Sequence, residues 1–140
     1  MTTGLIDTGR VVKITAEADL IEVRQVLRAA AQRAGLGLVD ETKIVTAGSE
    51  LARNILVHAA GISGELRVQQ VLNGSRKGVQ ATFADSGPGI ADIDAAMTDG
   101  YSTMGSLGLG LPGSKRLVDE LTLTSQVGVG TTVVIVKWAR

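Results

Sequence analysis

ELRVQQVLNGSRKGVQATFADSGPG, residues 65–89, is the stretch that decides the fold of this chain. Apolar and polar side chains alternate over residues 65–72, and residues 79–84 suit a returning strand, so each segment is expected to form a half-buried β-strand. Turn-forming residues fill Asn73–Gly78 between them, which predicts a hairpin. The second strand runs into Asp85–Gly89, a glycine-containing loop, so the backbone should be open to a ligand at the exit of this hairpin.

Toward the N-terminus, the pattern predicts one strand followed by two helices. Val11–Ile14 is the candidate strand. Apolar residues then recur at helical spacing after Asp19, a candidate N-cap, up to the glycines at positions 35 and 37. The second helix is expected to start near Asp40, which can cap it, and to end near residues 59–61.

Toward the C-terminus, a short helix is expected over Ile90–Met97 and irregular, glycine-rich chain over Asp99–Leu111. Pro112 suits the first turn of a further helix. A last hairpin should join Leu121–Val127 to Thr132–Trp138. This order of elements predicts an α+β fold: a two-layer α/β sandwich whose mixed, mostly antiparallel sheet carries the helices on one face.

Length and charge narrow the class of protein. The chain has 140 residues, so residues 1–140 are expected to form a single domain. Its 14 basic and 14 acidic residues balance, so neither nucleic acid nor an anionic membrane is expected as a partner. The sequence has no cysteine, which excludes disulfides and thiolate metal sites. With no signal-peptide pattern and no apolar run of membrane-spanning length, a cytoplasmic location is expected.

Glu50 and Asn54 lie one helical turn apart, so they share one face of the second predicted helix. A carboxylate beside a carboxamide can serve as a general base and a metal ligand. The alternative is an ordinary solvated helix face. Arg53 is either a phosphate contact or a surface residue, and His58, the only histidine, is assigned to packing or capping near the helix end.

Asp85 at the exit of the hairpin can accept a hydrogen bond, while Gly87 and Gly89 let a flat ligand approach the backbone. The same residues also suit an ordinary Asp-Ser-Gly-Pro turn. Farther on, Gly128–Thr132 is a tight turn whose threonine hydroxyls can line a pocket.

The run Gly105–Gly113 places exposed backbone N–H groups just before a helix N-terminus, which suits phosphate groups. Lys115 and Arg116 follow closely enough to add positive charge, and a flexible loop is the alternative. Within this run, Gly108-x-Gly110-x-x-Gly113 matches the dinucleotide fingerprint in form only. No strand precedes it and no acidic residue follows at about 20 positions, so this reading is rejected. The P-loop pattern does not occur in the sequence.

These segments together resemble the nucleotide-binding boxes of the GHKL superfamily of ATPases and kinases, in the order found there. Four segments carry the likeness: Glu50–Asn54, Asp85–Ile90, Gly105–Gly113 and Gly128–Thr132. Within the superfamily, the chain is most similar to the RsbT-like switch kinases of the stressosome, small serine kinases of bacterial partner-switching pathways. The residues that favour this branch are Ser49–Asn54, Asp99–Thr103, Leu111–Gly113, Lys115–Glu120 and Lys137–Arg140.

The resemblance implies a Bergerat-type ATP-binding fold, with ATP and Mg²⁺ as ligands, and a role for each matched residue. Glu50 would be the general base toward a serine hydroxyl, and Asn54 would coordinate Mg²⁺. Asp85 would bind the adenine amino group. The remaining implied nucleotide contacts are Gly87 and Gly89 around the base, Gly105, Gly108 and Gly110 in the lid over the phosphates, and Thr131 and Thr132 near the adenine.

The same resemblance implies a function: phosphorylation of a serine on a STAS-domain antagonist or scaffold protein in a stress pathway. After release, such a kinase binds and activates a PP2C-type phosphatase. A homodimer is one assembly that the resemblance allows. The alternative within the superfamily is an anti-sigma factor that sequesters a sigma factor directly.

Overall fold

The computed structural model describes residues 3–5, 9–58, 63–90, 97 and 110–140. Both hairpins, the two N-terminal helices and the helix containing Pro112 occur where the sequence predicts them, while a short first strand was not expected. The helix expected over Ile90–Met97 and the segment Asp99–Leu111 lie largely outside the described residues. In chain order, the described elements are β1 (Thr3–Leu5), β2 (Arg10–Ile14), α1 (Asp19–Ala34), α2 (Leu38–His58), β3 (Gly64–Asn73), β4 (Arg76–Asp85), α4 (Gly110–Leu117), β5 (Glu120–Gln126) and β6 (Gly130–Trp138).

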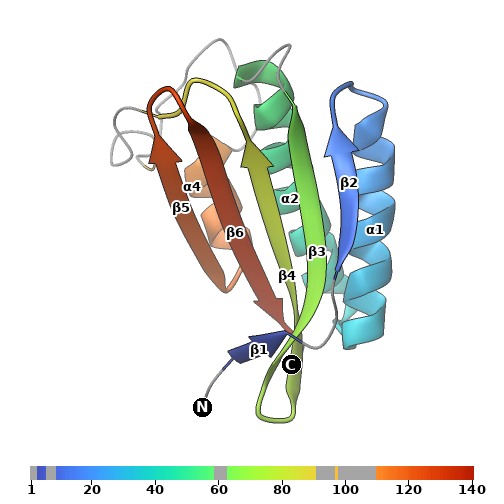
Figure 1. Cartoon of the computed structure of the whole chain (residues 1–140). Coiled ribbons are helices and arrows are strands. Elements are labelled where there is room, and N and C mark those ends of the chain that lie inside the picture. Colours follow the sequence, from blue (N-terminus) through green and yellow to red (C-terminus); the bar gives the residue numbers. More distant parts are fainter. Residues whose placement is uncertain (1–2, 6–8, 59–62, 91–96, 98–109) are drawn as a thin grey trace.

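The strands form one sheet of six, in the order β1-β3-β4-β6-β5, with β2 also paired to β3 (Figure 1). β2 pairs with Gly64–Val68 of β3, and β1 pairs with Val71–Asn73 of the same strand. All pairings among the described strands are antiparallel. The α+β class is therefore confirmed, but the parallel pair that a mixed sheet requires is not found within the described ranges. The two hairpins, β3–β4 and β5–β6, are antiparallel because tight turns join their strands.

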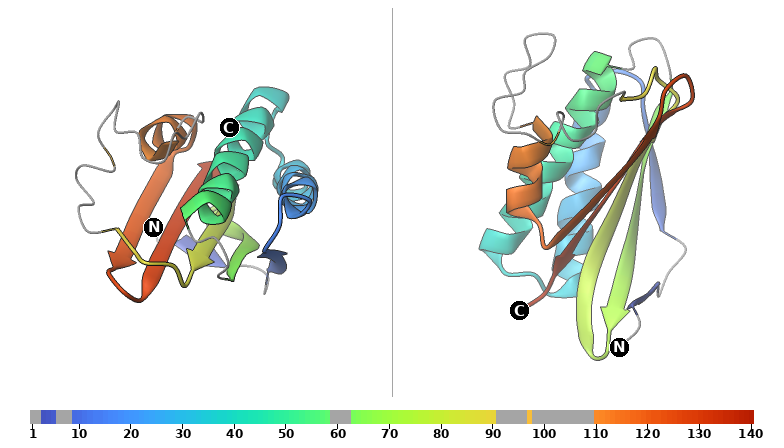
Figure 2. Two further views of the ribbon diagram at one scale, coloured as in Figure 1. Left: turned by 90° about the horizontal axis from the view of Figure 1, so that it is seen from above. Right: turned by 90° about the vertical axis from the view of Figure 1, so that its left-hand side faces the viewer.

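The described helices cover one face of the sheet, as predicted (Figure 2). Successive side chains of a strand point to opposite faces, and Val79, Ala81 and Phe83 of β4 are buried beneath the helices. α2 packs against both α1 and α4. The main core is therefore the layer between helices and sheet, and Phe83 is its aromatic member among aliphatic side chains. Within the described ranges, no helix is long and apolar enough to span a membrane.

Asp19 is the first residue of α1 and does not act as its N-cap. The N-cap position belongs to Ala18, which makes no side-chain capping bond. The Asp19 carboxylate instead accepts hydrogen bonds from the backbone N–H groups of Thr15 (2.8 Å) and Ala16 (3.0 Å) in the preceding turn. These bonds favour the charged form and lower the pKa of the Asp19 carboxyl. Asp19 thus fixes the turn between β2 and α1.

The sheet end that carries the C-terminus and the β3–β4 hairpin holds a buried ion cluster. The Lys137 side chain is 5% exposed, and its Nζ lies 3.4 Å from Asp40 Oδ1 and 3.7 Å from Asp119 Oδ1. A buried ammonium group requires such partners. Asp40 was expected to cap α2, but α2 already begins at Leu38, and Asp40 lies in the first turn, where it pairs with Lys137.

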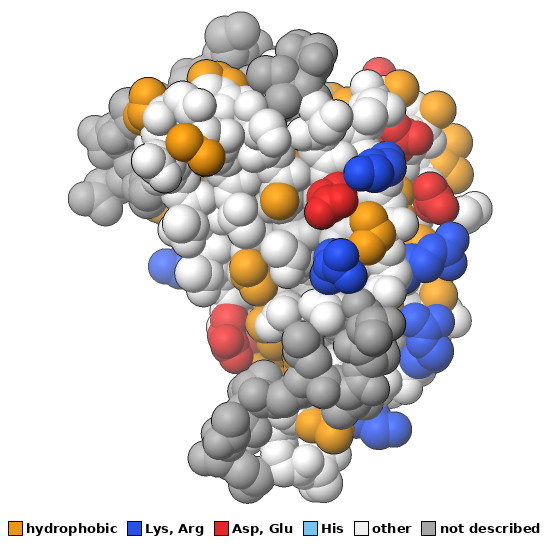
Figure 3. Space-filling model, viewed as in Figure 1, with side chains coloured by type: hydrophobic (Ala, Val, Ile, Leu, Met, Phe, Trp, Pro, Cys, Tyr) orange, Lys and Arg blue, Asp and Glu red, His pale blue; other side chains and the backbone are white. Residues whose placement is uncertain are grey.

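The opposite face of the sheet is the one seen in Figure 3. Charged side chains gather on the side of β2 and β3, where Lys13 Nζ lies 3.7 Å from Glu65 Oε2. The part formed by β5 and β6 is largely uncharged and includes the exposed Thr122 and Thr124. Most of the side chains expected from the sequence to bind a ligand do not lie on this face, but at one end of the molecule on the side of the helices.

Candidate functional site

The structure brings the α2 candidates and the Asp85 loop to the same end of the molecule. Glu50 and Asn54 are half-buried in the C-terminal half of α2. A Cβ at Gly64 of β3 would collide with the side chain of Ile55, the residue after Asn54, so α2 lies directly on the sheet there. Gly64 pairs with Asp85 in the β3–β4 ladder. Figure 1 shows the end of α2, the end of β4 and the β5–β6 turn together at the upper end.

Three polar side chains form a row across β5, β6 and β4 at this end. Thr131 of β6 pairs with Asp85 of β4 on one side and with Ser125 of β5 on the other. Residues directly opposite one another in an antiparallel pair point to the same face. Because Asp85 lies two residues after the buried Phe83, the row faces the helix-covered side of the sheet.

Thr132 is not part of this row. It pairs with Ala84 of β4 and with Thr124 of β5, so its side chain points to the open face of the sheet. Of the two threonines implied to lie near an adenine, the structure places only Thr131 on the same face as Asp85. Strand alternation makes this choice, since adjacent residues cannot both point toward the helices.

Asp85 shapes its own loop through one carboxylate oxygen. Its Oδ1 accepts a hydrogen bond from the N–H of the buried Gly87 at 2.8 Å. In the part of the chain that the structure describes, Oδ2 makes no hydrogen bond. The carboxylate therefore has one oxygen committed to the loop and one available to accept a bond from a ligand.

Gly89 is held against the β5–β6 turn in a conformation that suits glycine. Its φ is +81°, in the left-handed region, and a Cβ there would lie 2.5 Å from the carbonyl oxygen of Gln126. The N–H of Gly128 donates to the carbonyl of Pro88 at 2.9 Å. The Asp85 loop and the hairpin turn thus pack backbone to backbone, with no room for a side chain between them.

Ser125 is a polar member of this site that sequence reasoning did not identify. Its Oγ accepts a hydrogen bond from the Ile90 N–H at 2.7 Å and lies 2.9 Å from Thr131 Oγ1. It also lies 3.2 Å from the Gly130 carbonyl oxygen, to which it can donate. The predicted Gly128–Gly130 turn could have identified Ser125. Extending the hairpin register outward from that turn places Ser125 opposite Thr131.

The glycine-rich segment that the sequence predicts to be a lid lies within the described residues only at its end. Gly105 and Gly108 lie outside the described residues, whereas Gly110 opens α4 with a φ of +68°. Pro112 lies in the first turn of α4, as predicted. Lys115 and Arg116 lie in the last turn and are exposed, so they face the negative end of the helix dipole rather than the N-terminus where phosphates would bind.

The donor set at this end fits Mg-ATP. The amide oxygen of Asn54 is a hard oxygen ligand of the type that Mg²⁺ accepts together with phosphate and water, and the carboxylate of Glu50, one helical turn away, can accept a proton. Asp85 offers an acceptor at the same end of the sheet, and Gly87 and Gly89 of its loop carry no side chains of their own. The groups present can therefore receive an amino group at one side and a metal-bound phosphate chain at the other.

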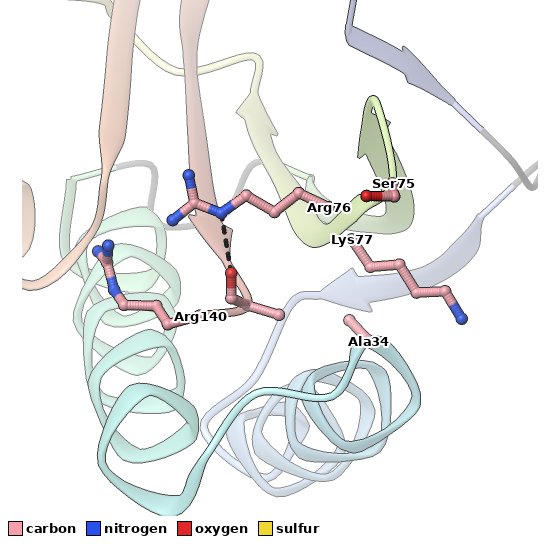
Figure 4. A pocket seen from close by; sticks show the side chains of 6 residues that line it. Ala34, Ser75, Arg76, Lys77 and Arg140 are labelled. Atoms are coloured by element: carbon pink, nitrogen blue, oxygen red, sulfur yellow. Dashed lines mark hydrogen bonds between the residues drawn. The ribbon is translucent and has the colours of Figure 1, made fainter.

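A separate hollow of about 560 Å³ lies at the opposite end of the sheet (Figure 4). Arg76 donates from Nε to the carbonyl oxygen of Ala139 at 2.9 Å and extends to the same side as Arg140, whereas Lys77 extends the other way. None of the predicted site residues lines this hollow. It is distinct from the end where Asp85 and the α2 candidates meet.

Comparison with known proteins identifies the family. The family described as histidine kinase-like ATPase domain matches residues 14–137. The serine/threonine-protein kinase RsbT of Bacillus subtilis (strain 168) is 46% identical over 129 residues, covering 92% of this chain and 96% of that protein. The chain belongs to the histidine kinase-like ATPase family, in its RsbT-like branch of serine/threonine-protein kinases.

More distant relatives of this chain include two anti-sigma factors and a protein of known structure. The anti-sigma F factors of Anoxybacillus flavithermus (strain DSM 21510 / WK1) and Geobacillus thermodenitrificans (strain NG80-2) are 30% and 32% identical over 105 residues, or 71% of this chain and 70% of each of theirs. The solved structure of the RsbU and RsbW domains of Rv1364c from Mycobacterium tuberculosis superposes with a TM-score of 0.63 at 22% identity. That match covers 94% of this chain and 33% of the solved one, and it shows the fold. The residues of the RsbT-like kinase from Glu50 to Thr132 all fall inside the range of the family match.

Proposed function

We propose that this RsbT-like kinase transfers the γ-phosphoryl group of Mg-ATP to a serine of a STAS-domain antagonist or scaffold protein, and that after release it binds and activates a PP2C-type phosphatase. One observation supports the location of this activity in the fold. The Asp85–Thr131 pair and the part of α2 that carries Glu50 and Asn54 lie at the same end of the sheet, although they are far apart in sequence. The 46% identity to a serine/threonine-protein kinase supports the reaction class.

Each described residue has a role that its position supports. Asp85, with Oδ2 available, would accept a hydrogen bond from the adenine amino group, and Thr131 beside it would contact the base. Gly87 and Gly89 would let the backbone close on the base, because neither residue carries a side chain. Gly110, at the N-terminus of α4, would belong to the phosphate-binding lid with Gly105 and Gly108, which lie outside the described residues. Thr132, on the open face, has no place in the proposed pocket.

The chemistry at α2 is positioning and proton acceptance. Phosphoryl transfer depends mainly on alignment and charge neutralisation, and Mg²⁺ would supply that neutralisation when bound. Asn54 would hold the metal through its amide oxygen. Glu50 would orient the serine hydroxyl and accept its proton late in the transfer, since a carboxylate is a weak base toward an alcohol.

Substitutions on one face of α2 test this proposal. The RsbT-like kinase is incubated with labelled ATP, Mg²⁺ and candidate STAS-domain proteins from the same organism, and the phosphorylated residue is mapped. Glu50→Ala should lower the transfer rate by about 10²–10⁴-fold with nucleotide binding retained, and Asn54→Ala should weaken Mg-dependent nucleotide binding. Thr46→Ala, exposed one turn earlier on α2, is the matched control and should behave like the wild type. Wild-type transfer by both Glu50→Ala and Asn54→Ala would refute the site.

The phosphatase step is tested separately. Glu50→Ala, mixed with the PP2C-type phosphatase and its phosphoprotein substrate, should still stimulate phosphate release, because binding requires the surface and not the proton acceptor. A Glu50 variant that folds and binds nucleotide but fails to stimulate the phosphatase would show that activation requires the catalytic residue.

A second candidate function is direct sequestration of a sigma factor. It is favoured by the 30% and 32% identities to anti-sigma F factors. Parallel capture experiments with a sigma factor and with the STAS proteins, each in the presence of Mg-ATP, separate the two functions. Retention of the sigma factor alone would favour the anti-sigma reading.

A further inference from the structure

We propose that the end of the molecule opposite the nucleotide site is a second docking surface, which binds an acidic segment of the PP2C-type phosphatase. The docking surface consists of the hollow lined by Arg76 and Arg140 (Figure 4) and of the exposed apolar pair Leu38 and Val39 at the start of α2. This inference rests on the proposed function, which includes the phosphatase as a partner, and adds to it the place and the chemistry of the contact.

Arg76 is held in place while its two terminal nitrogens stay unpaired. Its Nε donates to the carbonyl oxygen of Ala139 at 2.9 Å, and the N–H of Ala139 donates to the Lys77 carbonyl at 2.8 Å, so the side chain is tied to the sheet. Within the part of the chain that the structure describes, neither the terminal nitrogens of Arg76 nor Nζ of Lys77 have a hydrogen-bond or ion-pair partner. A guanidinium with both terminal nitrogens available can bind a carboxylate through two parallel hydrogen bonds.

The ion cluster beside the hollow balances its own charges and leaves that of Arg76 unmatched. Two carboxylates, Asp40 and Asp119, contact Arg140 of the hollow, and both also pair with the buried Lys137. This cluster therefore holds two cations and two anions. Arg76 adds a positive charge that pairs with no carboxylate of the described residues. An acidic segment of a partner complements this charge, and the attraction also speeds its association.

Next to the hollow, α2 begins with two apolar side chains that face solvent. Leu38 is 74% exposed and Val39 is 68% exposed, the highest values among the large apolar side chains of the described residues. Asp40 directly follows this pair, and its Oδ2 lies 3.8 Å from Arg140 Nε, so the start of α2 adjoins the hollow. Exposed apolar residues bordered by charged groups are typical of a protein interface, since covering them removes apolar surface from water. The expected segment of the partner therefore carries an apolar side chain beside its carboxylates.

The separation of the two ends decides which partner this docking surface fits. Arg76 and Asp85 are the first and last residues of β4. At about 3.3 Å per residue, about 30 Å separates the hollow from the proposed adenine site. A protein that receives the phosphoryl group has to bring its serine to the nucleotide end. The phosphatase receives none, so it can bind at the opposite end without contacting Glu50 or Asn54.

The experiment compares binding of the phosphatase with phosphoryl transfer in the same variants of the whole chain. Dissociation constants for the PP2C-type phosphatase of the same organism are measured by titration calorimetry, and transfer to the STAS-domain substrate is measured with labelled ATP. Arg76→Gln should bind the phosphatase about tenfold more weakly, because it loses hydrogen bonds between charged groups. Leu38→Gln should also bind it about tenfold more weakly, because an apolar side chain is no longer buried on binding. Both variants should transfer phosphate at the wild-type rate.

Lys13→Gln is the matched control, since it removes one exposed positive charge from the open face of the sheet, outside the hollow, and should leave both measurements unchanged. Leu38→Gln keeps every contact of Arg76, so it tests the surface even if Arg76→Gln folds poorly. Wild-type phosphatase affinity in Leu38→Gln and in folded Arg76→Gln would overturn the inference. Equal losses of phosphatase binding and phosphoryl transfer would also overturn it, because the substitutions would then act through the fold or the nucleotide site. A wild type that does not bind the phosphatase at all would refute the phosphatase step of the proposed function and this inference with it, whereas binding that both variants leave unchanged would refute the location alone.

Discussion

The contact between the Asp85 loop and the β5–β6 turn can be tested with two glycines that share one conformation. Gly89 and Gly128 both have a φ of +81°, so alanine is strained to the same degree at each position. They differ in their surroundings: a Cβ at Gly89 would lie 2.5 Å from the Gln126 carbonyl oxygen, whereas a Cβ at Gly128 would meet no atom within 4 Å. Gly128→Ala is therefore the control that carries the backbone strain without the collision.

The expected losses of stability follow from the backbone strain, which both variants share, and from the collision, which only Gly89→Ala has. The left-handed conformation costs an alanine about 1 kcal/mol, and this should be the whole loss in Gly128→Ala. In Gly89→Ala, the carbon and oxygen must separate to about 3.3 Å, which moves the loop and the turn apart by about 0.8 Å. That shift also stretches the 2.9 Å bond from the Gly128 N–H to the Pro88 carbonyl beyond hydrogen-bonding range. Overpacking and the lost bond together add about 2 kcal/mol, so Gly89→Ala should lose about 3 kcal/mol.

Urea unfolding and thermal unfolding measure the difference. At about 3 °C per kcal/mol for a chain of this size, the melting temperature should fall by about 3 °C in Gly128→Ala and about 9 °C in Gly89→Ala. ATP affinity should follow the same order, because Gly89 belongs to the proposed base-binding loop. Equal losses of stability in the two variants would refute the close backbone approach, since strain alone would then account for both.

Three further predictions concern other parts of the chain. Thr131→Val should weaken ATP binding about fivefold, whereas Thr132→Val should leave ATP binding unchanged. The reason is that the two side chains point to opposite faces of the sheet. Equal effects of the two substitutions in a binding titration would contradict that placement. Lys137→Ala should lower the free energy of unfolding by about 2–3 kcal/mol, since it removes the buried cation between Asp40 and Asp119 and leaves these carboxylates paired only with the exposed Arg140 among the described residues. The exposed Lys77→Ala should change the free energy of unfolding by less than about 0.5 kcal/mol in the same urea-unfolding assay. Neither substitution should alter ATP affinity in a binding titration. The lowered pKa of Asp19 means that its charged form stabilises the fold above its ordinary pKa and that this contribution disappears as the pH falls through the lowered value. Asp19→Asn should therefore be less stable than the wild type at neutral pH, with a difference that closes in urea unfolding at acidic pH; a difference independent of pH would count against the charged carboxylate.

Much of the fold could be predicted because local patterns determine it. The alternation over residues 65–72 and the turn residues at Asn73–Gly78 specify the β3–β4 hairpin, and the structure has it as Gly64–Asn73 and Arg76–Asp85. Pro112 marked the first turn of α4 for a similar reason, since a missing N–H costs nothing at a helix start. Where the prediction of an element failed, a distant partner was responsible: the pairing of β1 with Val71–Asn73 leaves no periodic signature in three residues.

The candidate site, like the fold, could be predicted only in part. Sequence alone supplied the chemistry: Glu50 and Asn54 one helical turn apart, an aspartate at a strand exit, and glycines before a helix. It could not choose between Thr131 and Thr132, because either threonine fits a turn followed by a strand. The ladder with β4 made that choice by fixing which of them faces the helices.

What the sequence by itself determined is the set of short-range features, since propensity, periodicity and turn chemistry act within a few residues of each position. The tertiary structure alone decided which of these features meet. Gly64 lets α2 lie on β3 beside Asp85, Gly89 lets the Asp85 loop touch the β5–β6 turn, and the register of β5 on β6 brings Ser125 to Thr131. These contacts join residues distant in sequence through close backbone approach and strand register, which depend on packing and hydrogen bonding over the whole sheet.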